Sequence, residues 1–265
     1  MAHSIYTMYF SPTGGTAKIA EAVADPIGEQ RGLMNIVLDL TKPAWRDVDV
    51  ACEKTDVFVF AFPVYGGRIP EVLHHQIELI SGQGTAAIPI AVYGNRDYDD
   101  ALIEAADLLR ERGFRVIAAG AFVGEHSMAP SVGAGRPDKD DLAQAKQFGR
   151  AVAQLIERDG GEEGPAPEVE VKGNRPYKDA MADLGVSPVT TDACTKCGIC
   201  VARCPMGIID ADDPAVIGEG CLRCNACVKA CPEDAKHFES EVIAGVVKML
   251  EGNCMARKEP EIFGV

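Results

Sequence analysis

The chain has 265 residues, and its hydrophobic share of 47% is that of an ordinary globular protein, which excludes a disordered chain. It carries 26 Lys and Arg against 40 Asp and Glu, so its formal net charge of −14 argues against binding to nucleic acid or to an anionic membrane surface. The longest uninterrupted apolar run, residues 57–65, is too short to insert into a membrane, and the first residues lack the basic start of a signal peptide. We therefore expect a cytoplasmic protein.

Strand-like and helix-like segments alternate over the first 158 residues. Short apolar runs predict five strands, at residues 4–10, 35–40, 56–64, 86–93 and 115–123. Helical periodicity predicts helices at residues 17–27, 71–80 and 99–112, and a last one that begins at Asp138 and ends at Gly160. Apolar strands that alternate with helices are typical of an α/β fold whose parallel sheet is covered on both faces, and such sheets bind ligands at the carboxyl ends of their strands.

The chain changes character after this region. The segment from Asp159 to Pro167 is polar and rich in Gly and Pro, as linkers are. We expect a first domain over residues 1–158, a connecting segment over 159–190, a small cysteine-rich domain over 191–240 and an extension over 241–265.

One cysteine motif occurs twice in the small domain. Both copies read Cys-x2-Cys-x2-Cys-x3-Cys-Pro, the first starting at Cys194 and the second at Cys221. Three thiolates at this spacing can bind one iron–sulfur cubane, while the fourth binds the other cluster. The first [4Fe–4S] cluster is therefore assigned to Cys194, Cys197, Cys200 and Cys231. The second is assigned to Cys221, Cys224, Cys227 and Cys204.

A pair of zinc sites is the alternative reading of these cysteines. Zinc sites usually pair two Cys-x2-Cys units across a spacer, and a run of three cysteines followed by Cys-Pro is not typical of them. The segment resembles the bacterial two-cluster ferredoxins over about 45 residues. This resemblance implies a small α+β domain that transfers single electrons at low potential.

The junction after the first strand carries a phosphate-binding signal. Its loop, Ser11-Pro-Thr-Gly-Gly-Thr16, leads into a helix at Ala17. Glycines let backbone N–H groups approach a phosphate, the helix N-terminus adds unsatisfied donors, and the hydroxyls add more. An ordinary helix start capped by Thr16 is the alternative.

This Ser-x-Thr-Gly-x-Thr loop resembles the FMN phosphate loop of the flavodoxins, and the loops after strands three and four, from Phe62 and from Tyr93, resemble those that hold the flavin ring. The resemblance covers roughly residues 3–158 and implies a flavodoxin-like, doubly wound sheet of five parallel strands in the order 2-1-3-4-5. It implies that FMN is bound by Ser11, Thr13, Gly14, Gly15, Thr16, Ala17, Pro63, Val64, Tyr65, Gly66, Gly67, Tyr93, Gly94, Asn95, Arg96, Asp97 and Tyr98.

Within that set the resemblance implies particular roles. Tyr98 matches the aromatic residue that stacks on the flavin, and Tyr65 would pack against its other side or its edge. Gly66 and Gly67 would permit a peptide flip toward flavin N5, because they lack side chains. Tyr65 is also a candidate proton donor.

A long connection follows the fifth strand, from Gly124 to Asp138, and long loops at this edge of a sheet are often functional. His126 in this loop is a candidate catalytic acid, because the pKa of histidine ordinarily lies near neutrality. A structural, hydrogen-bonded histidine is the alternative. Arg68, Arg96 and Arg136 are candidates to offset the charge of FMN or of a substrate, or else are ordinary surface arginines.

The whole chain resembles the flavodoxin–ferredoxin fusion proteins of anaerobes, and three functions follow. The first is an electron-transfer flavoprotein in which two clusters and FMN exchange electrons for a redox protein partner. The second is an FMN-dependent reductase of a small organic acceptor such as a quinone, a nitro compound or an activated alkene. The third is a redox sensor without catalytic activity. The sequence is compatible with a homo-oligomer and with a monomer.

Overall fold

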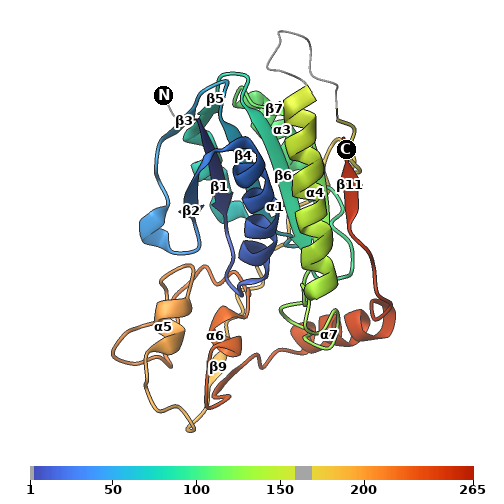
Figure 1. Cartoon of the computed structure of the whole chain (residues 1–265). Helices are drawn as coiled ribbons and strands as arrows, with labels where there is room; N and C mark the ends of the chain where they lie inside the picture. The colour runs from blue at the N-terminus through green and yellow to red at the C-terminus, as the bar shows by residue number, and fades with distance from the viewer. Residues whose placement is uncertain (1–2, 159–168) are drawn as a thin grey trace.

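The computed structural model describes residues 3–158 and 169–265, so the predicted linker, Asp159 to Pro167, lies outside the described residues. One part is a sheet between two layers of helices (Figure 1). The other is a small cysteine-rich part, drawn in orange, that lies beyond the end of the sheet where helix α1, Gly15–Arg31, begins.

The sheet is parallel apart from one edge. Its described strands follow the order β11-β8-β6-β4-β1-β2. Their bounds are β1 Ser4–Tyr9, β2 Met34–Asp39, β4 Val57–Pro63, β6 Ala86–Tyr93, β8 Ala119–Val123 and β11 Glu261–Phe263, with β7, Arg115–Val116, pairing with β6. When β7 and β11 are left out and the other five strands of this sheet are numbered in chain order, their order is the expected 2-1-3-4-5. This is the flavodoxin-like form of the doubly wound sheet.

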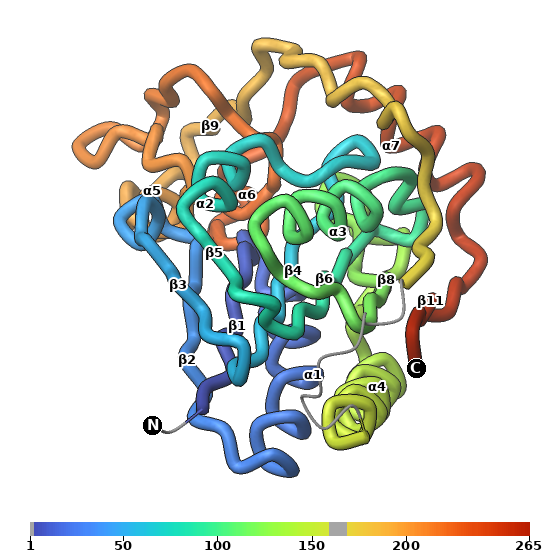
Figure 2. The backbone as a smooth tube through the Cα atoms, turned by 90° about the horizontal axis from the view of Figure 1, so that it is seen from above, coloured from blue at the N-terminus to red at the C-terminus, as the bar shows by residue number. Residues whose placement is uncertain are grey.

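The sequence of β4 shows why both faces of the sheet are covered. Alternate residues of a strand point to opposite faces. Phe58, Phe60 and Phe62 pack in one core cluster with α3, Ala101–Glu111, while Val57 and Val59 pack in the other with α1 and α4, Lys139–Arg158. Figure 2 shows α1 and α4 on one side of the sheet and α3 on the other.

Two predicted elements differ from the structure. The helix expected at residues 71–80 is a short turn, η2 Glu71–Leu73, followed by α2 His74–Glu78. The chain then forms β5, Ile80–Gly82, which pairs in parallel with β3, Val50–Cys52. The fifth predicted strand is divided into β7 and β8. A further short turn, η1 Pro43–Trp45, follows β2.

The cysteine-rich part contains two short helices and a small ladder. These are α5 Ile199–Arg203, α6 Ala226–Lys229, and the antiparallel pair of β9 Val189–Thr190 with β10 Lys236–His237. The extension after it begins with α7, Glu241–Asn253. It then returns to the sheet, where β11 pairs antiparallel with β8.

The described part of the connecting segment packs on the first domain. The backbone N–H groups of Asn174 and Lys178 donate to the carboxylate of Asp100, each at 2.7 Å. The guanidinium of Arg175 donates to the carboxylate of Asp107. Among the described helices, none is both long enough and apolar enough to cross a membrane.

Candidate cofactor sites

The loop after β1 leaves backbone donors free at the start of α1. Gly14 adopts a positive φ of 86°, and the Ser11 hydroxyl accepts a hydrogen bond from the Ala17 N–H at 2.9 Å. The N-cap residue is therefore Gly14 rather than Thr16, and Ser11 satisfies one N–H group of the first turn. Within the described residues the N–H groups of Gly15 and Thr16 have no hydrogen-bond partner, so the helix N-terminus can accept an anion.

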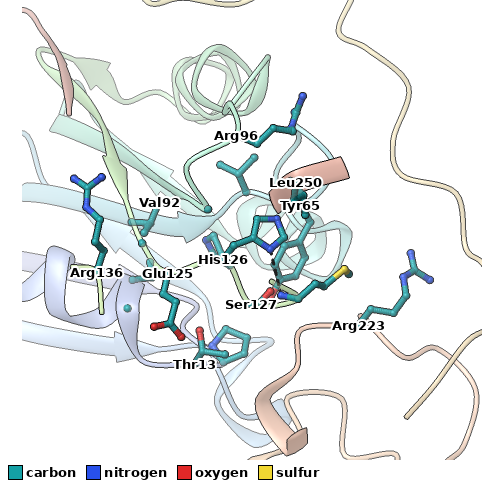
Figure 3. A pocket seen from close by; sticks show the side chains of 18 of the residues that line it. Thr13, Tyr65, Val92, Arg96, Glu125, His126, Ser127, Arg136, Arg223 and Leu250 are labelled. Atoms are coloured by element: carbon teal, nitrogen blue, oxygen red, sulfur yellow. Dashed lines mark hydrogen bonds between the residues drawn. The ribbon is translucent and has the colours of Figure 1, made fainter. Parts of the chain in front are cut away.

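This loop borders a cavity of about 510 Å³ at the carboxyl edge of the sheet. Figure 3 shows Thr13, Tyr65 and His126 around it. Its volume lies within the range of small-molecule sites, about 300–1,000 Å³. Ten of the residues expected at a site line it: Thr13, Gly15, Thr16, Pro63, Val64, Tyr65, Gly66, Gly94, Arg96 and His126.

The other expected residues do not line the cavity: Ser11, Gly14, Ala17, Gly67, Tyr93, Asn95, Asp97 and Tyr98. The stacking role expected for Tyr98 is wrong in this structure, because its side chain is fully buried in the core. The C-terminal segment packs on the loop that carries it. The Asn95 side chain donates to the carbonyl groups of Cys254 and Ala256, and the Tyr98 hydroxyl donates to the Glu261 carboxylate at 2.7 Å.

Much of the cavity wall comes from segments that the sequence did not indicate. The connecting segment contributes Lys178 and Met181, and the cysteine-rich part contributes Leu222, Arg223 and Lys229. Helix α7 adds Val246, Met249 and Leu250. An apolar stripe at helical spacing marks α7 in the sequence, but its location over the cavity depends on how the distant parts pack.

The charge of the cavity is opposite to that of the chain. In the described lining six side chains are basic and one, Glu125, is acidic; the basic ones are Lys18, Arg96, Arg136, Lys178, Arg223 and Lys229. Lys229 pairs with Glu125, and Arg96 pairs with Asp99. The exposed amine of Lys18 has no partner within the described residues. Such a cavity favours an anionic ligand.

Two of the expected arginines form ion pairs with buried carboxylates of the protein. The Nε of Arg136 donates a hydrogen bond to the Asp141 carboxylate at 2.8 Å, and its Nη1 donates one to the Lys258 carbonyl at 2.7 Å. Arg68 lies outside the cavity and pairs with buried Glu104 at 2.6 Å. Although burial opposes ionisation of Glu104, the hydrogen bonds from Arg68 and the Ile69 N–H, with His74 nearby, lower its pKa to about 2. Both guanidinium groups thus stabilise the fold rather than remaining free for a ligand.

His126 is neutral at neutral pH. Burial, together with the positive charges of Arg96 and Lys229, lowers the pKa of His126 to about 4. Its Nδ1 accepts hydrogen bonds from the backbone N–H groups of Met128 and Ala129, at 3.2 and 3.3 Å. The ring proton of the neutral form is therefore on Nε2. The ring can donate a hydrogen bond, but it is not the charged acid expected from an ordinary pKa.

Tyr65 stands at the boundary with the cysteine-rich part. It lies in a tight turn in which Tyr65 and Arg68 exchange backbone hydrogen bonds across Gly66 and Gly67, both with positive φ. A Cβ built on Gly66 would lie 2.7 Å from the Met181 Cβ, so only glycine fits against the connecting segment. Burial, and then the negative charge of the Cys224 thiolate, raise the pKa of Tyr65 well above 10. Tyr65 therefore stays protonated.

The eight motif cysteines surround two smaller cavities. Cys194, Cys197, Cys200 and Cys231 line one, and Cys204, Cys221, Cys224 and Cys227 line the other. This is the grouping that the crossed assignment requires, and four thiol groups per cavity suit a [4Fe–4S] cluster. All ten cysteines are free of disulfides. No three described His, Cys, Asp or Glu side chains are spaced to hold a single metal ion.

The second cysteine cavity adjoins the large one. Leu222 and Arg223, which lie between Cys221 and Cys224, line both. The first cysteine cavity shares no lining residue with the large one among the described residues, and its Cys197 is exposed. One group of cysteines thus lies beside the large cavity, and the other includes an exposed cysteine.

Comparison with known proteins identifies the cysteine-rich part. Residues 193–236 match the family model of the 4Fe-4S dicluster domain. No curated protein is found to be similar to the chain.

Among solved structures, a flavodoxin from the domain Archaea is 18% identical, with a TM-score of 0.41 over 58% of this chain and 99% of that one. A flavodoxin of Streptococcus pneumoniae TIGR4 is 21% identical, with a TM-score of 0.40 over 57% of this chain and 98% of its own. An azoreductase from Bacillus anthracis is 14% identical, with a TM-score of 0.41 over 58% of this chain and 100% of its own.

The chain thus joins two recognisable parts. The first is a flavodoxin-like, doubly wound sheet, as its strand order shows. The second is a 4Fe-4S dicluster domain, which carries the duplicated cysteine motif. The expectation of a flavodoxin-like domain followed by a two-cluster ferredoxin-like domain is confirmed.

Proposed function

We propose that the protein is an iron–sulfur flavoprotein that transfers electrons between two [4Fe–4S] clusters and FMN, and serves a redox protein partner. When bound, a cluster supplies one-electron transfer, and FMN supplies transfer of one or two electrons. The observation that carries this proposal is the wall formed by Leu222 and Arg223, which belongs both to the second cysteine cavity and to the large basic cavity.

The residues of the large cavity suit FMN. The free N–H groups of Gly15 and Thr16, with Thr13 and Lys18 nearby, would hold the phosphate. Tyr65, Gly66, Gly94 and His126 would surround the ring, and neutral His126 would donate a hydrogen bond from Nε2. Met181 and α7 reduce the access of water to the cavity. This mixture of apolar and basic side chains suits a flavin that carries a phosphate.

The two cysteine groups suggest an order of electron transfer. The group around exposed Cys197 would exchange electrons with the partner, and the group around Cys224 would exchange them with the flavin. Glu233, exposed and lining the first cavity, adds negative charge there, as expected for a partner with a basic surface.

A second candidate function rests on another cavity. A cleft of about 340 Å³ is bordered by Tyr65, Cys221 and Arg223, among others, and so lies beside both proposed cofactor sites. It offers room for a small organic acceptor, as in a reductase. Because the large cavity itself is walled by the cysteine-rich part and α7, we favour electron transfer to a protein.

The test uses the full chain, reconstituted under anaerobic conditions with iron, sulfide and FMN. A one-electron donor reduces it while visible and EPR spectra follow the clusters and the flavin separately. We expect Cys197→Ser to retain FMN but to slow flavin reduction at least tenfold, because the solvent-facing cluster is lost. Cys254→Ser, a cysteine outside both groups, should behave as the wild type. Failure to retain FMN, or flavin reduction at the wild-type rate in Cys197→Ser, would contradict the proposal.

A further inference from the structure

The wall between the two proposed cofactor sites contains a buried cation. The Arg223 side chain is only 4% exposed, and it borders the second cysteine cavity, the large basic cavity and the cleft beside them. Figure 3 shows Arg223 at the edge of the large cavity, on a segment of the cysteine-rich part. Of the described basic residues around the large cavity, only Arg223 also borders a cysteine cavity.

The duplicated motif provides an internal comparison for Arg223. The equivalent residue of the first motif is Lys196, which also precedes the second cysteine of its motif. The two backbones match, with φ of 54° at Arg223 and 55° at Lys196. The side chains do not: that of Lys196 is 63% exposed and pairs with Asp213 at the surface. The motif therefore explains the shared backbone conformation, but not why the side chain at this position is buried in the second copy and exposed in the first.

Two nitrogen atoms of the Arg223 guanidinium form hydrogen bonds, and the third does not. Its Nη1 donates to the Asp183 carboxylate at 3.1 Å, and its Nη2 donates to the Ala182 carbonyl at 3.0 Å. Its Nε is buried and has no partner in the described structure. An unpaired buried donor destabilises the fold, so an acceptor is expected there.

The pairing with Asp183 offsets this charge only in part. The Asp183 side chain is 73% exposed, so water screens its carboxylate, whereas Arg223 is shielded from water. A cation in a poorly hydrated wall acts strongly on charges that arise on either side of it. The chemistry of the two neighbouring sites, thiolate ligands on one side and an anion-binding cavity on the other, would provide acceptors for the Nε–H group.

We propose that Arg223 is a positioning residue that sets the reduction potentials on both sides of this wall, with its Nε–H donated to the group held in one of the two cavities. The inference rests on the proposed function. One electron leaves the cluster bound by Cys221, Cys224, Cys227 and Cys204 and arrives at the flavin, so the cluster is oxidised as the flavin is reduced. The negative charge moves from one side of Arg223 to the other and stays beside the same cation.

The test compares Arg223→Gln, Arg223→Lys and Lys196→Gln in the reconstituted full chain. Iron, sulfide and FMN contents are measured first, and the midpoint potentials of the flavin and of each cluster are then measured by spectroelectrochemical titration. Removing the buried charge should disfavour electron gain. We expect Arg223→Gln to lower the reduction potentials of the flavin and of the second cluster. Each shift should correspond to at least a tenfold change in the one-electron equilibrium constant, about 59 mV.

The other variants separate charge from structure. Arg223→Lys should keep both potentials closer to the wild-type values than Arg223→Gln does, because the cation is retained. Lys196→Gln, which removes the exposed cation at the equivalent position, should leave the flavin potential unchanged. Asp183→Asn should shift both potentials in the positive direction, because it removes the carboxylate that faces Arg223.

Two results would overturn this inference. One is wild-type potentials in Arg223→Gln with full cofactor content, and the other is an equal shift of the flavin potential in Lys196→Gln. If Arg223→Gln does not retain its cofactors, Asp183→Asn tests the inference instead. Potentials in Asp183→Asn that do not shift in the positive direction would then refute it. If the wild-type chain itself retains no FMN, the proposed function fails instead, so the two failures are distinguishable.

Discussion

The hydroxyl group of Tyr98 donates a hydrogen bond to the carboxylate of Glu261, 2.7 Å away, although 163 positions of sequence separate the two residues. Glu261 begins β11, and Tyr98 lies in the loop after β6. The bond therefore attaches the C-terminal strand to the loop that the flavodoxin resemblance assigned to the flavin. It also explains why the ring of Tyr98 packs in the core instead of facing the large cavity.

The variant Tyr98→Phe tests this account. Because Glu261 is half-exposed and can be hydrated again, we expect the free energy of unfolding to fall by only about 1 kcal/mol, measured in urea. The affinity for FMN should stay within twofold of the wild type, since Tyr98 does not line the cavity. A large loss of FMN affinity with unchanged stability would restore the stacking role.

The stability of the protein should depend on pH through His126. Its pKa is about 4 in the folded protein and about 6.5 when unfolded, so the unfolded chain binds more protons between these values. The stabilising contribution of the neutral ring is fully present above about pH 6.5 and is lost as the pH falls toward 4. Allowing for the partial exposure of the ring, we expect a loss of roughly 1 kcal/mol between pH 7.5 and pH 5.

His126→Asn removes the titrating ring from this window. Its free energy of unfolding should fall less than that of the wild type between pH 7.5 and pH 5, with both proteins measured in urea. Parallel pH profiles for the two proteins would show that His126 does not titrate in this way.

Lys18 should contribute to anion binding by charge alone. It lines the large cavity, is exposed, and has no partner among the described residues. We expect Lys18→Gln to raise the dissociation constant of FMN about fivefold at low salt, and less at high salt, because salt screens exposed charges. The quenching of flavin fluorescence on binding measures this dissociation constant. The control is Lys146→Gln, an exposed lysine on α4 outside the cavity, which should bind FMN as the wild type does.

The pair formed by Arg136 and Asp141 should matter for folding. Both side chains are almost fully buried, and Asp141 accepts from Arg136 and from the Asp138 N–H. We expect Asp141→Asn to lower the free energy of unfolding by about 3 kcal/mol, because it leaves a buried guanidinium without its carboxylate. Chemical denaturation at neutral pH measures the change. The exposed neighbour Asp140→Asn serves as the control, and equal stability of the two variants would argue against the role of the buried pair.

Local sequence patterns predicted much of the fold and part of the site. Apolar runs such as Val57–Pro63 define buried parallel strands, and the loops that follow them meet at one edge of the sheet. The cysteine spacing indicated which cysteines share a cavity, because a crossed pair of clusters needs the fourth cysteine of the other motif.

The rest depends on contacts between distant segments. Periodicity near Leu250 indicates a helix, but not that the helix covers a cavity formed by the first domain. Tyr98 follows the local pattern of a flavin-stacking residue, yet the packing of the C-terminal segment determines where its ring points. The lowered pKa of His126 likewise follows from its burial and from the charges of Arg96 and Lys229, which come from other segments.

The addition of β11 beside β8 has a consequence for electron exchange. The cysteine-rich part leaves the first domain through the segment that binds Asp100 and returns to it through α7 and β11, so it is held at both of its ends. Under the proposed function, electron transfer between this tethered part and the large cavity would be unimolecular, and its rate would not depend on protein concentration or on solvent viscosity.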